Sequence, residues 1–104
     1  AGILTLTAFI SPYRNDRETA RTASSEDIHE IFIDADLSIC ERRDPKGLYR
    51  KARRGEIPDF TGISAPYEAP EAPEFTVDTG ALDIAQSVAA LAKYVANAFE
   101  QRKD

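Results

Sequence analysis

Apolar residues follow two different spacings along this chain, and these spacings predict strands and helices in alternation. Residues 3–9 are apolar or β-branched at nearly every position, which is typical of a strand buried on both faces of a parallel sheet. Residues 28–34 predict a second strand, and Phe75–Asp78 a third, short one. From Asp83 to about Gln101 the apolar residues recur every three or four positions, which predicts an amphipathic helix. Its apolar stripe consists of Ile84, Val88, Leu91, Val95 and Phe99.

Shorter helices are predicted between these strands. Ser11-Pro12 ends the first strand, because proline lacks a backbone donor. Residues 13–23 are fair to good helix formers, and residues 24–27 form a polar break after them. The spacing within this helix places three arginines on one face, namely Arg14, Arg17 and Arg21.

Two further helices are predicted at Leu37–Arg43, with Asp36 as its N-cap, and at residues 47–54, where Gly55 fits the C-terminal stop. Residues 56–74 contain four of the six prolines and are predicted to form an ordered loop. The alternation of strands and helices predicts an α/β sheet with right-handed crossovers.

Composition and length limit the classes of protein that this sequence fits. At 104 residues and 30% charged residues it is at most one small globular domain, and no apolar run reaches the roughly 18–20 residues that span a bilayer. The net charge of −5 argues against a general nucleic-acid binder. One cysteine, Cys40, cannot form an internal disulfide, which together with the absence of a signal-peptide pattern favours a reducing, cytoplasmic location. The chain contains no methionine and begins within a predicted strand, so we expect it to be part of a longer polypeptide.

A basic segment at residues 42–54 changes this picture. It contains seven of the 13 lysines and arginines, with Asp44 as its only acid. Such a local excess of positive charge repels itself unless an anion neutralises it. Phe60-Thr61-Gly62 and the proline-containing loop follow directly. The pattern favours a cationic, aromatic-bearing loop that closes over a flat anion such as a nucleotide, although a solvated charged helix face is the alternative.

Three groups of residues could take part in chemistry. Ser11 lies at a predicted strand-to-helix turn, where free N–H groups favour a phosphate or sulfate, and Arg14 and Arg17 would add charge-assisted contacts. The alternative is an ordinary turn hydroxyl with solvated arginines. In the basic segment, Arg43 could stack on a base and Lys46 could reach an anion.

Phe60 lies in a polar loop, where it offers a stacking surface or, as is common, fills the core. His29 stands alone within a strand, and Cys40 is a small residue in a helix. Neither has metal-ligand spacing, so both are expected to be structural.

Six strings in the sequence together resemble a known family. They are FISPYR with DR (9–17), RDPKGLY (43–49), KAR (51–53), GEI (55–57), FTGI (60–63) and YEAPEAPE (67–74). Through them the chain closely resembles the C-terminal portion of adenylyl-sulfate kinase (APS kinase), a P-loop kinase of sulfate assimilation. The resemblance implies that residues 1–104 are the C-terminal part of a three-layer α/β P-loop kinase fold, with parallel strands, helices and a lid loop at residues 46–70.

The family transfers the γ-phosphate of MgATP to the 3′-hydroxyl of adenylyl sulfate, which gives PAPS. By resemblance, Ser11 corresponds to the family's phosphoserine intermediate, although direct in-line transfer would need no covalent step. Lys46 corresponds to a residue that reaches the phosphosulfate or the transferring phosphate, and Arg43 to one that stacks on the ATP adenine. The residues implied for the adenylyl sulfate pocket are Ile10, Arg14, Phe60, Thr61 and Gly62.

The sequence also departs from this family. It contains no G-x-x-x-x-G-K-[ST], so the phosphate cradle, its lysine and the Mg²⁺-binding hydroxyl are missing from these residues. We therefore expect the ligands of Mg²⁺ upstream of residue 1 and no turnover by the 104 residues alone. The family's strand that leads into the phosphate loop lies between the equivalents of residues 3–9 and 28–34. Without it we expect unpaired strand edges, and a chain that is marginally stable or self-associating.

Two other classes of function remain open. A non-catalytic nucleotide-binding or regulatory kinase-like module is the main alternative, and a G-x-x-x-x-G-K-[ST] upstream would decide against it. A protein-interaction domain is less favoured, because the proline-rich loop has no PxxP with basic anchors. The resemblance implies ATP and adenylyl sulfate as partners, a homodimer, and fusion or association with sulfate adenylyltransferase.

Overall fold

The computed structural model describes residues 4–23 and 28–100, so the predicted polar break at residues 24–27 and the predicted end at Gln101 lie outside the described residues. The described strands form a two-stranded parallel sheet of β1 (Ile31–Asp34) and β2 (Phe75–Asp78). Ile31 lies opposite Phe75, and Asp34 lies opposite Asp78. The strand predicted at residues 28–34 is thus confirmed in its second half.

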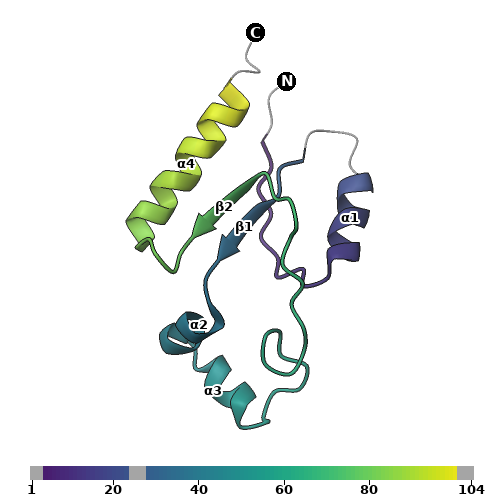
Figure 1. Cartoon of the computed structure of the whole chain (residues 1–104), viewed down its shortest axis with the longest axis vertical. Helices are drawn as coiled ribbons and strands as arrows, with labels where there is room; N and C mark the ends of the chain where they lie inside the picture. The colour runs from purple at the N-terminus through teal and green to yellow at the C-terminus, as the bar shows by residue number, and fades with distance from the viewer. Residues whose placement is uncertain (1–3, 24–27, 101–104) are drawn as a thin grey trace.

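The helices surround this sheet in an open arrangement. α1 (Arg14–Ala23) lies on one side and α4 (Ile84–Glu100) on the other, next to β2 (Figure 1). α2 (Leu37–Arg43) and α3 (Leu48–Arg53) lie beyond the carboxyl ends of the strands. The loop predicted at residues 56–74, named the returning loop from here on, then leads back to β2. In an α/β fold this end of the sheet is where ligands usually bind.

Local signals explain the start of α4 and the end of α3. Asp83 and Gln86 form a reciprocal capping box at the start of α4, in which each backbone N–H donates to the side chain of the other, at 3.0 and 2.7 Å. Gly55 has φ +76° directly after the end of α3, as its predicted role requires. Asp36 occupies the N-cap position of α2 as predicted, but its side chain accepts no capping hydrogen bond.

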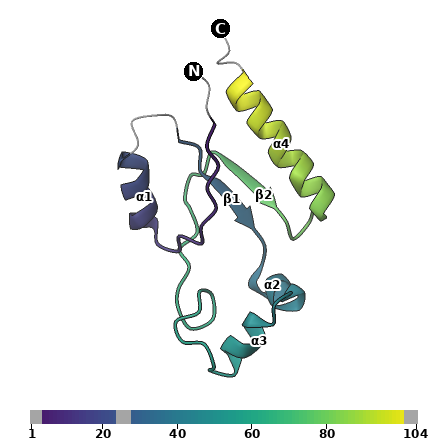
Figure 2. The same cartoon turned by 180° about the vertical axis from the view of Figure 1, so that it is seen from behind.

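The strand predicted at residues 3–9 is wrong for the residues that the structure describes. Residues 4–10 are exposed and form neither strand nor helix, and Figure 2 shows this segment as a plain trace in front of the sheet. Leu6 is 76% exposed and Phe9 is 81% exposed. The apolar pattern indicates a preference only, because a strand also needs a neighbouring strand to bond with its N–H and C=O groups.

The core of the described residues is thin. Only Ala52 and Val77 are fully buried apolar residues there. The main aromatic contact stacks Phe75 of β2 on Tyr94 of α4, with ring centroids 4.5 Å apart. The apolar stripe of α4 is only partly buried: Leu91, Val95 and Phe99 are half-buried, while Ile84 and Val88 are exposed. None of the described helices combines the length and apolar character that crossing a membrane requires.

Candidate functional site

Ser11 lies in a strained turn that precedes α1. Its φ of +42° falls in the left-handed region, which costs an L-residue about 1–2 kcal/mol. Neighbouring groups hold this turn: Arg17 Nη1 donates to the Ser11 carbonyl at 2.5 Å, and the Glu68 backbone N–H donates to the Pro12 carbonyl at 2.7 Å. Ile10, which precedes the turn, is 70% exposed. The turn is thus fixed by residues of α1 and of the returning loop.

Glu68 also caps α1 from a distance. Its carboxylate Oε1 accepts the backbone N–H of Arg14 at 2.7 Å, which is the role of an N-cap side chain taken by a residue 54 positions away. Arg14 Nε in turn donates to the Ala69 carbonyl at 2.9 Å and lies 3.7 Å from Glu71. Arg14 is therefore held by groups of the returning loop, and its binding of substrate stays a prediction.

The arginines of α1 face carboxylates from two other segments. Arg17 Nε lies 3.1 Å from Glu30, and Arg21 forms a two-pronged pair with Glu74 at 2.8 and 3.1 Å. Hydrogen bonds from the Arg21 guanidinium hold the pKa of Glu74 at about 2, well below its usual 4.5, and the Glu30 backbone N–H adds to this effect. A cavity of about 390 Å³ lies between α1 and residues 70–74. Much of the positive charge predicted to face an anion is neutralised within the protein here.

The basic segment at residues 42–54 is also more balanced than its sequence indicates. Arg53 pairs with both oxygens of Glu41, at 2.6 and 3.0 Å, and Arg54 with Glu56 at 2.5 Å. Arg50 lies 3.3 Å from Asp44. Two of these three acids, Glu41 and Glu56, flank the segment. The excess of positive charge is therefore smaller in the fold than the sequence of residues 42–54 indicates.

Asp44 anchors the start of α3. It is 8% exposed, and its two carboxylate oxygens accept the backbone N–H groups of Tyr49 and Arg50 at 3.0 and 3.1 Å. Burial raises the pKa of Asp44, but these two N–H donors and the Arg50 guanidinium outweigh it and bring the pKa below its usual value. The carboxylate is thus held ionised at the turn that carries Lys46.

Arg43 and Lys46 lie on either side of this anchor. Arg43 Nη2 donates to the Thr79 carbonyl at 2.6 Å, which ties the end of α2 to the turn that follows β2. Both side chains are exposed, and among the described residues Lys46 has neither an ion pair nor a side-chain hydrogen bond. Lys46 is therefore available to an anion, whereas Arg43 is already oriented by the protein.

Phe60, Thr61 and Gly62 form a tight turn that packs against α2 and α3. The Phe60 carbonyl accepts three successive N–H groups from residues 63–65, and the Phe60 ring meets Tyr49 edge-on with centroids 5.0 Å apart. Gly62 has φ +88°, and a Cβ added there would lie 3.3 Å from Leu37 Cδ1. The Phe60 ring is thus half-buried and in contact with Tyr49 in this structure, and its stacking on a nucleobase stays a prediction.

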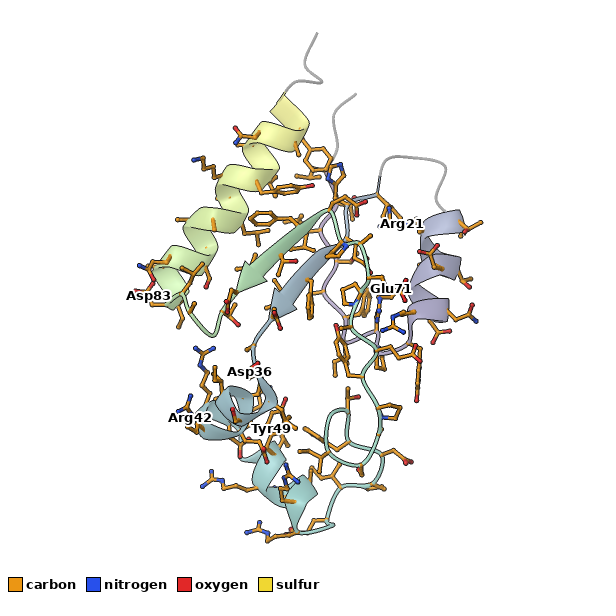
Figure 3. All side chains as sticks on the ribbon, viewed as in Figure 1. Arg21, Asp36, Arg42, Tyr49, Glu71 and Asp83 are labelled. Carbon is orange, nitrogen blue, oxygen red and sulfur yellow. The ribbon has the colours of Figure 1, made fainter. Side chains whose placement is uncertain are left out.

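The predicted site residues fall into two groups. Ser11 and Arg14 lie with α1 and residues 67–71, whereas Lys46 and Phe60 lie with α2 and α3. Figure 3 shows Arg21 and Glu71 beside α1, and Arg42 and Tyr49 at the far end. Among the described residues no hydrogen bond or ion pair joins the groups directly; they are connected through the loop that leads from Phe60 to Glu68. Their convergence on one ligand remains a prediction.

The described residues do not fit a Mg²⁺ site. Within residues 4–23 and 28–100, no three His, Cys, Asp or Glu side chains are placed to hold a metal ion. Asp34 and Asp78 lie opposite each other at the carboxyl ends of the strands, but among the described residues they belong to no group of three ligands that could hold a metal ion. No step of the chemistry is therefore assigned to a metal bound by this part of the chain.

Glu68 and Asp44 anchor the candidate site, and neither role was predicted from the sequence. Glu68 bonds to residues 54 and 56 positions earlier, and no local pattern signals contacts of that separation. An N-cap residue usually lies directly before its helix, and Gly47 occupies that position at α3. Asp44 lies four residues before α3, so this rule does not identify it. The Asp44-Pro45 pair, a common turn signal, was the one available indication.

Comparison with known proteins places this arrangement of a parallel sheet, flanking helices and a long loop in the P-loop kinase fold. The solved structure of the Mycobacterium tuberculosis APS kinase CysC in complex with AMPPNP and APS superposes with a TM-score of 0.70 and 41% identity, over 81% of this chain and 50% of that one. The adenylylsulphate kinase family profile matches residues 1–78. The chain belongs to the adenylylsulphate kinase family.

Curated relatives agree with this assignment. The adenylyl-sulfate kinases of Geotalea uraniireducens and Staphylococcus epidermidis are 53% and 55% identical over 96 residues, which is 91% of this chain. Those 96 residues cover 46% and 48% of the two relatives. The chain thus spans about half the length of the curated relatives that it matches. All eight predicted site residues lie within the region matched by the family profile.

Proposed function

We propose that this chain supplies the acceptor-site turn and the lid, residues 46–70, of a kinase that transfers the ATP γ-phosphate to the 3′-hydroxyl of adenylyl sulfate, giving PAPS for sulfate assimilation. The family match over residues 1–78 is the observation on which this proposal depends. It is supported by the similar Mycobacterium protein, whose structure contains AMPPNP and APS.

The described geometry supports separate roles for these residues in binding the acceptor and in neutralising charge. The Ser11 hydroxyl, in the turn before α1, would lie at the acceptor end, with Ile10 and Arg14 beside it. Lys46, which is exposed on the turn anchored by Asp44, would neutralise charge on the sulfonucleotide or on the transferring phosphate.

The turn at Phe60, Thr61 and Gly62 would contribute binding once the lid closes. The Phe60 ring would leave Tyr49 and stack on the adenine of adenylyl sulfate, while Arg43 would stack on the adenine of ATP. Closure would exclude water, so that the phosphate goes to the sugar hydroxyl.

Further expectations accompany this proposal. The Mg²⁺ that accompanies ATP would be held by residues outside the described part of the chain. We expect the protein to form a homodimer and to be cytoplasmic. We also expect it to be fused to, or in a complex with, sulfate adenylyltransferase. These 104 residues alone are expected to be inactive, because they contain no phosphate cradle.

The test is PAPS formation from ATP and adenylyl sulfate, followed by coupled ADP release. The complete polypeptide that includes this sequence should form PAPS, and Lys46→Ala should lower its kcat/KM at least tenfold. The 104-residue chain is measured beside it. PAPS formation by that chain would refute its inactivity, and a complete polypeptide that binds nucleotide without turnover would favour the regulatory module instead.

A further inference from the structure

Arg17 is the residue of α1 whose described side-chain contacts include both the Ser11 turn and Glu68. Its side chain is 15% exposed, against 48% for that of Arg14. Nη1 donates to the Ser11 carbonyl and Nη2 to the Glu68 carbonyl, each at 2.5 Å, while Nε lies 3.1 Å from Glu30. A single guanidinium therefore joins the turn before α1, the returning loop and the start of β1.

The joined segments are those that carry the candidate chemistry. The Ser11 turn needs support because its backbone is in the left-handed region. The returning loop includes the end of the predicted lid, residues 46–70, and its Glu68 bonds the same turn through the Pro12 carbonyl and the Arg14 N–H. The turn and the loop thus form one unit with Arg17 at its centre.

We propose that Arg17 is a positioning residue that fixes the Ser11 turn to the base of the lid, so that lid and acceptor end keep one geometry. This inference rests on the proposed function for its catalytic consequence, but not for the clamp itself. A lysine could not replace the arginine, because its ammonium is a single point of charge, whereas the planar guanidinium reaches two carbonyls and a carboxylate at once.

The experiment uses the complete polypeptide that includes this sequence, with Arg17→Lys as the variant and Arg21→Lys as the matched control. Arg21 lies on the same helix face and pairs with Glu74 and Glu30, and its described contacts include neither Ser11 nor Glu68. Backbone hydrogen exchange, followed amide by amide, reports on the clamp. Steady-state kinetics with each substrate varied reports on its consequence.

For Arg17→Lys we expect the Arg14 and Glu68 amides to exchange at least tenfold faster. The KM for adenylyl sulfate should rise about tenfold, while the KM for ATP stays within twofold. Arg21→Lys should change none of these more than twofold. Because a merely structural residue would lower the activity toward both substrates alike, the separation of the two KM values identifies positioning.

Two outcomes would overturn the proposal: unchanged exchange in Arg17→Lys, or equal effects in Arg17→Lys and Arg21→Lys. If Arg17→Lys does not fold, Arg17→Gln is measured instead, since its shorter, neutral side chain cannot join Ser11, Glu68 and Glu30 at once. Faster exchange of the Arg14 and Glu68 amides is expected, and an unchanged rate would refute the clamp. A wild-type protein that makes no PAPS would contradict the proposed function only, and the exchange result would still decide the clamp.

Discussion

At the scale of single residues, Glu74 has the clearest electrostatic role. Its carboxylate accepts hydrogen bonds from Arg21 and from the backbone N–H of Glu30, and its pKa is held at about 2. A carboxyl group whose pKa is lower in the folded than in the unfolded state stabilises the fold above its unfolded pKa, near 4.5. This stabilisation is lost as the pH falls from about 4.5 toward 2.

We therefore predict that acid weakens the wild-type chain more than it weakens Glu74→Gln. Because the pair is partly exposed and screened by solvent, the difference between pH 6 and pH 3 should be only about 1 kcal/mol in the free energy of unfolding. Urea unfolding at a series of pH values measures it. Glu71→Gln is the control, since the Glu71 side chain is 78% exposed and 3.7 Å from Arg14. Parallel pH profiles for wild type and Glu74→Gln would contradict the assignment.

At the scale of elements, α4 depends on its first turn. The capping box of Asp83 and Gln86 satisfies two N–H groups that the helix itself leaves free. Asp83→Ala should therefore destabilise the chain by about 1 kcal/mol, and Gln86→Ala by less. In the double variant the two effects should not add, because each side chain serves the other. Circular dichroism during urea unfolding measures all three, with the exposed Lys93→Ala as a control, and additive losses would argue against a reciprocal box.

Elements with local signals could be predicted from the sequence, and those that depend on distant partners could not. Leu37–Arg43 and Phe75–Asp78 were predicted to the residue, because caps, spacing and β-branched residues act within a few positions. The strand predicted at residues 3–9 was wrong for the described residues, because pairing is not local. The same limit applies to the candidate site. The sequence placed Arg14 and Arg17 on one face of α1, but their partner Glu68 comes from more than 50 residues away.

At the scale of the whole molecule, the chain is more open than its size predicts. Its accessible surface is 8,074 Å², against about 5,800 Å² for a compact protein of this mass. Its radius of gyration is 16.0 Å, where about 13 Å is usual. The excess surface, roughly 2,300 Å², is as large as many stable protein interfaces. Part of it is apolar, including Phe9 and Ile84, which are 81% and 85% exposed.

These 104 residues by themselves should therefore be marginally stable and should self-associate through this apolar surface. Phe9→Asp should reduce the association, while its cost in folding free energy should stay within about 0.5 kcal/mol, because the side chain is largely exposed. Thr7→Asp adds the same charge to the same exposed segment without removing an apolar side chain, so it separates apolar contact from charge repulsion. Sedimentation velocity over a range of concentrations measures the association. A wild-type chain that stays monomeric and melts cooperatively at high temperature would show that the open surface is stable without a partner, and equal effects of the two variants would assign the association to charge.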